Sequence, residues 1–312
     1  MQQTTWADRG RQLRFEGGDP PERFNRCLGL ARLGGASVSA PLFSVWIQLR
    51  GHGWVEAREG RFDLSAGDWI MLERDSSPQV QVGGRGLCIG LLLDAEALAA
   101  LEALADVVLY SGRGHLSRAE RSAALRLWRE AAPQGDVQSV RPLLLYLASV
   151  QRELAARVGY CPGRSRSHKR QVFGRMQRAR LYLEGNSHRV VRIDEVARLA
   201  NFSSWYFSKA FHELYGESPQ ALAARLRLER AAALLRDTSM MVGEGAAASG
   251  FDNSCSFARA FRARYGVTAT RYRTGQDRQS ERAAGARRTP RAVRNVPDAF
   301  NASLTTSGER TQ

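Results

Sequence analysis

The sequence predicts an α+β protein with more than one domain: a small β-barrel with helices in the N-terminal half, and an all-helical C-terminal domain. Three observations lead to this fold class. Short runs of alternating apolar and polar residues fill residues 42–93, a C-terminal segment recurs about 50 residues later, and positive charge is concentrated on that repeated part. A chain of 312 residues is long enough for about two domains, each with its own core.

The N-terminal half begins with a polar arm, from Met1 to about Pro21, and continues into short segments with the alternation of strands. Glycine-containing turns separate these segments at Gly51–Gly53, Gly60 and Gly67, as in hairpins. Such strands and turns predict a small barrel or jelly roll. The predicted strands are Phe43–Leu49, Trp54–Arg58, Arg61–Leu64, Trp69–Glu73, Gln79–Val82 and Leu87–Leu93.

Three aromatic side chains of this region are candidates for lining a ligand pocket: Trp46, Trp54 and Trp69. The alternative is that they are ordinary core residues, because aromatics at strand spacing bury large apolar areas. A metal-dependent barrel would need clustered histidine and carboxylate ligands, whereas His52 is the only histidine among the predicted strands. We therefore expect no metal, no cofactor and no catalytic residue.

Three helices are predicted after the strands, at Ala95–Leu104, Ser117–Ala132 and Ser139–Val158. The last of them carries an apolar stripe at helical spacing: Leu143, Leu144, Leu147, Val150 and Leu154. This stripe has two interpretations, since it either pairs with its twin in a homodimer or covers the barrel of its own chain. Residues 160–170 are rich in Pro, Gly, Ser and basic residues without periodicity, which predicts a linker.

The repeat follows a helix predicted at about Gln171–Leu183, and each copy is predicted to form a helix, a tight turn and a second helix. In the first copy Asn201 is suited to the left-handed conformation that ends a helix, and Ser203 is suited to cap the next one. The second helix of each copy has an apolar stripe, formed by Phe207, Ala210 and Phe211 and by Phe257, Ala260 and Phe261.

The second copy differs from the first at its turn and in its supporting helix. Phe202 and Phe251 are one residue out of step with the rest of the repeat, so one copy has a longer turn than the other. In the second copy Gly250 is expected to form the turn. Between the copies, Ser218 and Pro219 predict a cap and first turn for a helix that extends to Arg236. This helix would hold the two copies at a fixed separation.

The net charge of +15 is distributed unevenly along the chain. Residues 1–159 contribute +1, residues 160–275 contribute +11, and residues 276–312 contribute +3. The excess therefore lies on the part that holds the repeat, as expected of a surface that meets phosphates. The alternative, a solvated basic face, is less attractive next to two helix-turn-helix units.

At these residues the sequence resembles the AraC/XylS family of bacterial transcription regulators. The resemblance rests on several motifs in order at the right spacing: Ile193–Ala197, Tyr206–Phe211, Tyr215–Pro219, Leu226–Leu235, Ser249–Phe251 and Phe257–Gly266. It implies a sequence-specific regulator of promoter DNA, usually an activator that contacts RNA polymerase. It also implies a cupin-like N-terminal barrel that senses a small-molecule effector or mediates dimerisation.

The resemblance also indicates which side chains read DNA, because the family uses the solvent face of the reading helix just after its cap. The candidates are Trp205, Ser208, Lys209 and His212 in the first copy and Cys255, Ser256, Arg259 and Arg262 in the second. Lys209 and Arg259 can donate to guanine, and Trp205 can pack on sugar or a thymine methyl group. The alternatives are phosphate contact for Arg259 and an idle exposed aromatic for Trp205.

The second copy departs from the family pattern in ways that predict a weaker unit. Gly245 replaces the usual Ile or Val, Gly243 lies two residues before it, and each glycine costs ~1 kcal/mol against Ala inside a helix. Ala269 and Thr270 follow Thr268 where the usual Ser-Pro is missing. We expect a frayed supporting helix in this copy, and base reading that depends mainly on the first.

Four parts follow: an effector-sensing or dimerising domain at 1–159, a basic linker at 160–170, a DNA-binding domain at 171–275 and a disordered basic tail at 276–312. Scattered cysteines without a CxxC pair indicate reduced thiols in a cytoplasmic protein, and no apolar run approaches the ~18 residues of a membrane span. Binding to DNA would associate the protein with the bacterial nucleoid. Two alternatives stay open: a DNA-alkylation-repair enzyme, for which Cys161 is the nearest candidate nucleophile, and a non-specific nucleoid-type binder.

Overall fold

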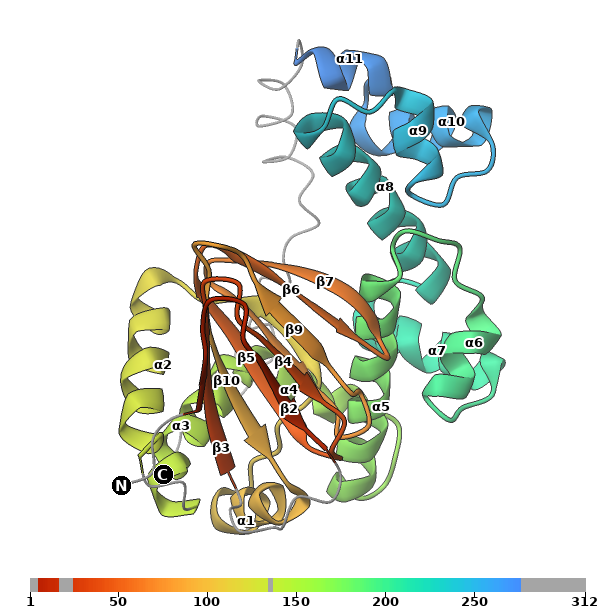
Figure 1. Cartoon of the computed structure of the whole chain (residues 1–312). Coiled ribbons are helices and arrows are strands. Elements are labelled where there is room, and N and C mark those ends of the chain that lie inside the picture. Colours follow the sequence, from red (N-terminus) through yellow and green to blue (C-terminus); the bar gives the residue numbers. More distant parts are fainter. Residues whose placement is uncertain (1–4, 17–24, 134–136, 276–312) are drawn as a thin grey trace, which may run out of the picture. The chain divides into compact units, whose positions relative to one another are not determined.

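The computed structural model describes residues 5–16, 25–133 and 137–275 (Figure 1). Contacts divide the chain into an N-terminal unit, Met1–Arg227, and a C-terminal unit, Leu228–Gln312, with the division inside helix α8 (Pro219–Asp237). The predicted tail at 276–312 lies outside the described residues. Within them, every helix is too short or too polar to cross a membrane.

The strands of the N-terminal unit form two sheets that do not close into one, so the small barrel, one of the two predicted architectures, is wrong. The six-stranded sheet has the order β1 (Thr5–Ala7), β3 (Asn25–Ala31), β10 (Leu87–Leu93), β5 (Phe43–Arg50), β8 (Asp68–Leu72) and β11 (Gly112–His115). The five-stranded sheet has the order β2 (Gln12–Phe15), β4 (Gly35–Val38), β9 (Gln79–Val82), β6 (His52–Ala57) and β7 (Gly60–Ser65). Pairing is antiparallel except for β1 with β3 and β2 with β4.

The residues expected to form a polar N-terminal arm are partly structured instead. Strands β1 and β2 form because three apolar side chains of this segment, Ala7, Leu13 and Phe15, are buried between the sheets. Each strand pairs in parallel with a strand that follows it in the chain. The short length of these segments hides them in the sequence, since four alternating residues are a weak strand signal.

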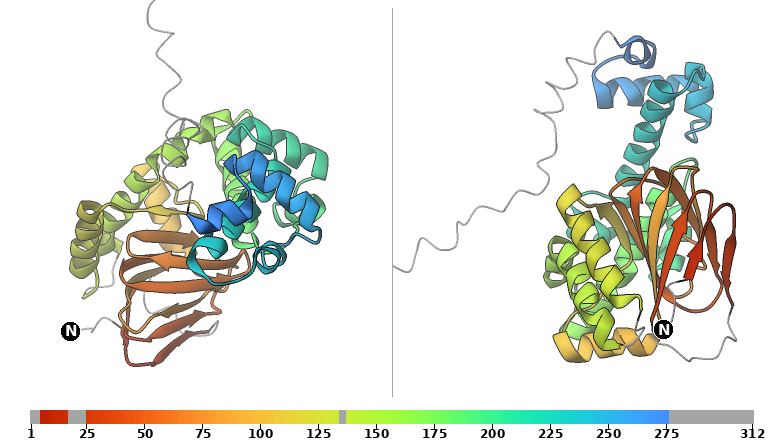
Figure 2. Two further views of the ribbon diagram at one scale, coloured as in Figure 1. Left: turned by 90° about the horizontal axis from the view of Figure 1, so that it is seen from above. Right: turned by 60° about the vertical axis from the view of Figure 1, so that its left-hand side comes forward.

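A core between the two sheets holds them face to face (Figure 2). Trp46, Phe62 and Ile70 are at most 1% exposed there. Strand β5 is buried along most of its length because its alternate side chains face two different cores: Trp46 faces the other sheet, whereas Val45 and Ile47 face the opposite way. A strand buried on both faces reads as a continuous apolar run.

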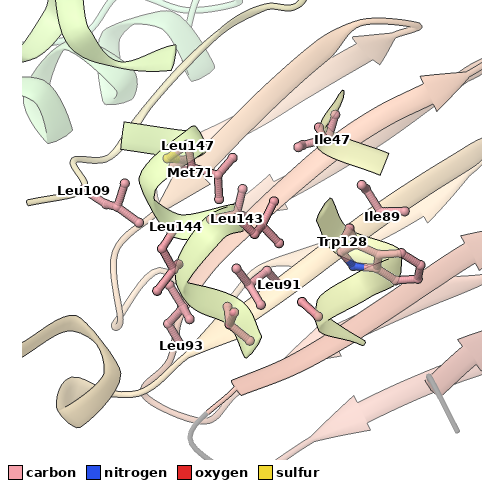
Figure 3. Packing of buried hydrophobic residues seen from close by; sticks show 14 of the residues in the cluster. Ile47, Met71, Ile89, Leu91, Leu93, Leu109, Trp128, Leu143, Leu144 and Leu147 are labelled. Carbon is pink, nitrogen blue, oxygen red and sulfur yellow. The ribbon is translucent and has the colours of Figure 1, made fainter. Parts of the chain in front are cut away.

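Helices α1 (Ala95–Ala105), α2 (Arg118–Ala131) and α3 (Val137–Val150) cover the other face of the six-stranded sheet (Figure 3). The apolar stripe of α3 is used here, because Leu143, Leu144 and Leu147 are each 2% exposed. Of the two interpretations of the stripe, the structure therefore has the one in which it covers the sheet of its own chain.

Helix α5 (Arg166–Gly185) explains why the two sheets do not close into a barrel. It packs against both β7 and β11, the edge strands of the two sheets, and its Leu181 joins the core between them. The helix thus occupies the gap that strand pairing would have to close. It begins at Arg166 because Ser165 caps it, accepting a hydrogen bond from the His168 amide, so the last five residues of the predicted linker are helical.

Buried polar contacts fix α5 on the β6–β7 turn. Arg178 Nε donates to Glu59 Oε1 at 2.8 Å, and the Glu59 side chain is fully buried. Asn186 Nδ2, just after the helix, donates to the Glu59 carbonyl oxygen at 3.0 Å. Gly60 and Gly185 allow the two backbones to touch, because a Cβ on Gly60 would lie 2.5 Å from the Gly185 carbonyl carbon.

Candidate nucleic-acid interface

The first helix-turn-helix lies in the last part of the N-terminal unit and has the predicted turn and cap residues. Helix α6 (Ile193–Leu199) leads into Asn201, whose φ of 54° is the left-handed conformation expected there. Ser203 caps α7 (Ser204–Tyr215) and accepts from the Tyr206 amide at 3.3 Å. The predicted turn and cap of this copy are confirmed.

An aromatic ladder fixes the buried face of α7. Phe207 and Phe211 are fully buried with ring centroids 5.4 Å apart, and Tyr215 continues the row at 4.5 Å from Phe211. They share a core with Phe173 and Met176 of α5. Because one side of α7 is filled in this way, its other side is left to the solvent.

The second helix-turn-helix lies in the C-terminal unit and repeats the arrangement. Helix α9 (Val242–Ala247) is followed by Gly250 at φ 72°, and α10 (Ser254–Tyr265) begins after Asn253. Asn253 caps α10 by accepting from the Cys255 and Ser256 amides at 2.8 and 3.1 Å. The turn has one residue more than in the first copy, as the shifted phenylalanines predict.

The aromatic ladder of α10 matches that of α7 closely. Ring centroids lie 5.3 Å apart for Phe257 and Phe261, and 4.6 Å apart for Phe261 and Tyr265. An additional helix that the sequence reading missed, α11 (Ala269–Thr274), places Tyr272 5.4 Å from Phe261. Thr268 caps it, accepting from the Arg271 amide, and so supplies the helix start that the missing Ser-Pro would have supplied.

The candidate reading residues of α7 share its solvent side. Trp205 is 73% exposed, and Lys209 Nζ lies 5.4 Å from the centroid of its ring, a cation–π contact. His212 is exposed one turn further on, and Ser208 is half-buried. The structure thus brings Trp205 and Lys209 together on the surface of the helix that follows the turn.

The candidates of α10 occupy equivalent positions. Cys255, Ser256, Arg259 and Arg262 are all exposed. Lys209 and Arg259 are each the sixth residue after the cap, and His212 and Arg262 are each the ninth. Because both helices are held by the same ladder, each unit presents its cations on the corresponding side.

A charged cluster anchors α6, which supports the first reading helix. Glu195 accepts from Arg189 and Tyr182 of the preceding segment, with Arg189 Nη1 at 3.1 Å from Glu195 Oε2. The Arg189 hydrogen bonds are the main reason that the pKa of Glu195 falls from an ordinary 4.5 to about 2. Sequence reasoning missed this cluster, since the three residues show no periodicity.

The glycines of α9 lie in different surroundings. Gly245 is buried, and a Cβ there would lie 3.4 Å from Leu235 Cδ2, whereas a Cβ on Gly243 would meet nothing within 4 Å. Helix α9 is formed over six residues, one fewer than α6. The expected fraying of α9, and a leading role for the first unit in base reading, stay predictions.

The structure does not bring the three tryptophans of the N-terminal unit together. Trp46 is in the core between the sheets, and Trp69 faces the helices on the opposite side of its sheet. Trp54 is half-buried next to Val55, which faces the core, and carries the Arg61 guanidinium 4.7 Å over its ring. Among the three, Trp69 lines a cavity.

Cys161 has the properties of a structural thiol. It is 3% exposed, and burial raises its pKa to about 11. A cysteine nucleophile requires a lowered pKa and access, so the residue is unsuited to accepting an alkyl group from DNA. Among the described residues, no group of three or more His, Cys, Asp or Glu side chains is placed to hold a metal ion.

Comparison with known proteins identifies the helical region. A family model described as a helix-turn-helix domain matches residues 196–275. The Transposon Tn10 TetD protein of Escherichia coli is 33% identical over 93 residues, which cover 30% of this chain and 67% of that protein. The transcriptional activator AarP of Providencia stuartii is 27% identical over 109 residues, covering 35% of this chain and 81% of that protein.

A solved structure of a probable AraC family transcriptional regulator from Rhodopseudomonas palustris matches with 33% identity and a TM-score of 0.31, covering 32% of this chain and 94% of that one. The match spans only 32–39% of several longer curated relatives. Similarity is thus found over the helix-turn-helix region. Through this C-terminal domain, the chain belongs to the AraC/XylS family of transcription regulators.

Proposed function

We propose that the protein regulates transcription by binding specific promoter DNA through both helix-turn-helix units. The observation that carries the proposal is the repetition of one surface: α7 and α10 expose a cation at the sixth and, in α10, again at the ninth residue after the cap. A charge of +11 on residues 160–275 favours approach to the phosphate backbone. Phosphates supply affinity, and the exposed side chains of the reading helices supply sequence preference.

One chain would then read two DNA segments. Reading helices that enter successive major grooves on one face of the duplex have centres ~34 Å apart, about one helical turn. In this arrangement Lys209 and Trp205 contact one segment, and Arg259 contacts the other. A protein with a single unit needs a dimer for the same purpose.

Residues 1–159 are proposed to control this activity by binding a small-molecule effector, as a cupin-like sensory domain would. Activation through contact with RNA polymerase in the cytoplasm follows from the resemblance to activators, of which AarP is one by name. A homodimer is part of the same proposal and must use a surface other than the α3 stripe, since those leucines face the sheet.

Selection of duplexes from a random library, followed by footprinting, tests the proposal. We expect an enriched motif with two elements about 10 base pairs apart. The double variant Lys209→Ala, Arg259→Ala should lose the enrichment, whereas Arg126→Ala, an exposed arginine of α2, should retain it. Equal recovery of all sequences would instead support the non-specific nucleoid-type binder.

A further inference from the structure

A cavity of about 350 Å³ lies within the N-terminal unit, beside the edge strand β11 and α5. Its lining includes the apolar residues Trp69, Leu154 and Leu181, together with several charged side chains. The volume falls in the range of small-molecule sites, and eight of the fifteen lining residues are charged or polar. The cavity adjoins the core between the sheets, because Leu181 contributes to both.

An unpaired amide faces this cavity. Gln177 of α5 lines it and is 3% exposed, and its Nε2 has no hydrogen-bond partner among the described residues. Native proteins seldom leave a buried donor unpaired, and water or a bound molecule usually supplies the acceptor. The amide therefore calls for an acceptor from inside the cavity.

The charges around the cavity divide into paired and unpaired groups. Arg180 is bonded to Glu184 at 3.0 Å, His115 to Asp68 at 2.9 Å, and Glu120 accepts from the Ser117 amide in a helix cap. In the described part of the chain, Arg113 and Arg157 have no carboxylate partner, and Glu153 has no cation. Two guanidinium groups that contact aromatic rings but no carboxylate, and one unpaired amide donor, thus line the cavity with one carboxylate that has no cation.

We propose that this cavity binds a small organic carboxylate with an apolar body. The carboxylate accepts from Arg157 and from Gln177 Nε2, and the apolar body lies against Trp69 and Leu154. Guanidinium groups suit carboxylates because they donate two parallel hydrogen bonds. A cationic ligand would leave both arginines and the amide without acceptors.

A ligand bound at this site would alter a contact at the end of the first reading helix, α7, and would therefore act as the effector. The Arg157 and Arg180 guanidinium groups lie 5.9 and 5.0 Å over the ring of Tyr215, the last residue of α7. A carboxylate that draws Arg157 into the cavity changes its contact with that ring. This second step rests on the proposed function, whereas binding at the cavity does not.

Calorimetric titration of the full chain with three matched probes tests the site. They are 3-phenylpropionate, 3-phenylpropionamide and 3-phenylpropylamine, which share a body and differ in the charge of the head group. We expect one molecule of the acid to bind per chain, the amide to bind about tenfold more weakly, and the amine not to bind. Absence of binding by the acid, or equal affinity for acid and amide, would overturn the proposal.

Variants locate the bound acid. Arg157→Met and Gln177→Leu should each weaken binding of 3-phenylpropionate about tenfold. Arg152→Met is the matched control, because Arg152 is exposed in α4 (Arg152–Ala155) and does not line the cavity. Arg157 is half-buried, so Arg157→Met is expected to fold. It still tests the site if Gln177→Leu, at a buried position, fails to fold. Unchanged affinity in Arg157→Met would contradict the site.

The effector role is measured separately, by the anisotropy of a labelled duplex carrying the selected motif. Saturating 3-phenylpropionate should shift the DNA affinity of the wild type and leave that of Arg157→Met unchanged. Binding of the acid with no shift in DNA affinity would overturn the effector role. Failure of the chain to bind DNA at all, with the acid still bound, would overturn the proposed function and not the site.

Discussion

Arg259 is the exposed side chain of α10 on which we expect base preference to depend most. It is held on the solvent side of α10 by an aromatic ladder on the other side of the helix. We expect Arg259→Ala to cost about 1–3 kcal/mol of binding and to relax preference at one base position, since a bidentate contact to guanine is lost.

Affinities for all single-base variants of the selected motif check this expectation, with Arg126→Ala as the control for loss of one positive charge. A uniform loss across every sequence, together with a smaller salt dependence, would assign Arg259 to the phosphate backbone.

Gly245 is a second position where one atom matters. Gly245→Ala should stabilise the C-terminal unit by ~1 kcal/mol, because alanine restricts the unfolded chain and its Cβ would meet Leu235 Cδ2 at an ordinary 3.4 Å. Gly243→Ala has the same propensity gain with open space around its Cβ. Hydrogen exchange of the α9 amides measures both; stabilisation by Gly243→Ala alone would mean that the Leu235 contact is too close.

Glu195 gives the first unit a dependence on pH with a defined sign. Its folded-state pKa, lowered to about 2 mainly by Arg189, lies below the ordinary 4.5 of an unfolded chain. Its contribution to stability is therefore complete above about 4.5 and is lost as the pH falls toward 2. Glu195→Gln should lower the melting temperature at pH 7. At pH 3 the difference in melting temperature between the variant and the wild type should be smaller. A difference that stays constant with pH would contradict the argument.

Among the elements, helix α5 matters most for the stability of the N-terminal unit, because it fills the gap between two sheet edges. Arg178→Met would leave the buried Glu59 carboxylate without its cation, at a cost of about 3–5 kcal/mol of unfolding free energy. The double variant Glu59→Met, Arg178→Met should recover much of that loss, since the buried Glu59 carboxylate is removed together with its cation. Urea denaturation of the three proteins measures this, and a double variant as unstable as the single one would show that packing, and not charge, is responsible.

The helices of the repeat were predictable from the sequence, and α5 was only partly so. Ser203 and Ser218 mark the starts of their helices because each hydroxyl accepts a hydrogen bond from the backbone amide three residues further along the chain. Asn253 does the same, but it lies inside the longer turn, where the repeat no longer aligns. The start of α5 was obscured because Arg166–Arg170 are all polar and resemble a linker.

The open sheets were hidden for a different reason. Alternation along a strand reports which side chains are buried, but not which strand lies beside it, and a barrel and a two-sheet sandwich share the same alternation. Whether the sheets close depends on what packs between their edges, and here α5 places Leu181 in the core between them. This residue is far from the strands in sequence. The cluster of Glu195, Arg189 and Tyr182 is likewise a product of tertiary packing.

For the whole molecule, the division of labour follows the distribution of charge. The residues that build the two sheets and their covering helices are nearly neutral, and the excess charge begins where α5 begins. In the proposed scheme, α5 and Tyr215 link the basic surface of the reading helices to a domain whose net charge is close to zero. Raising the salt concentration should weaken DNA binding steeply while leaving binding of 3-phenylpropionate, which depends on two partly sheltered groups, much less affected.

The constant spacing of the two copies has a use in engineering. Residues 203–216 and 253–266, from the cap to the closing glycine, correspond one to one. Each segment ends with a left-handed glycine, Gly216 in the first and Gly266 in the second. They are interchangeable cassettes: transplanting the first into the place of the second should rewrite one half of the recognised motif and leave the other intact. A segment that also included the turn, 201–216 in place of 250–266, would be one residue shorter than the segment it replaced.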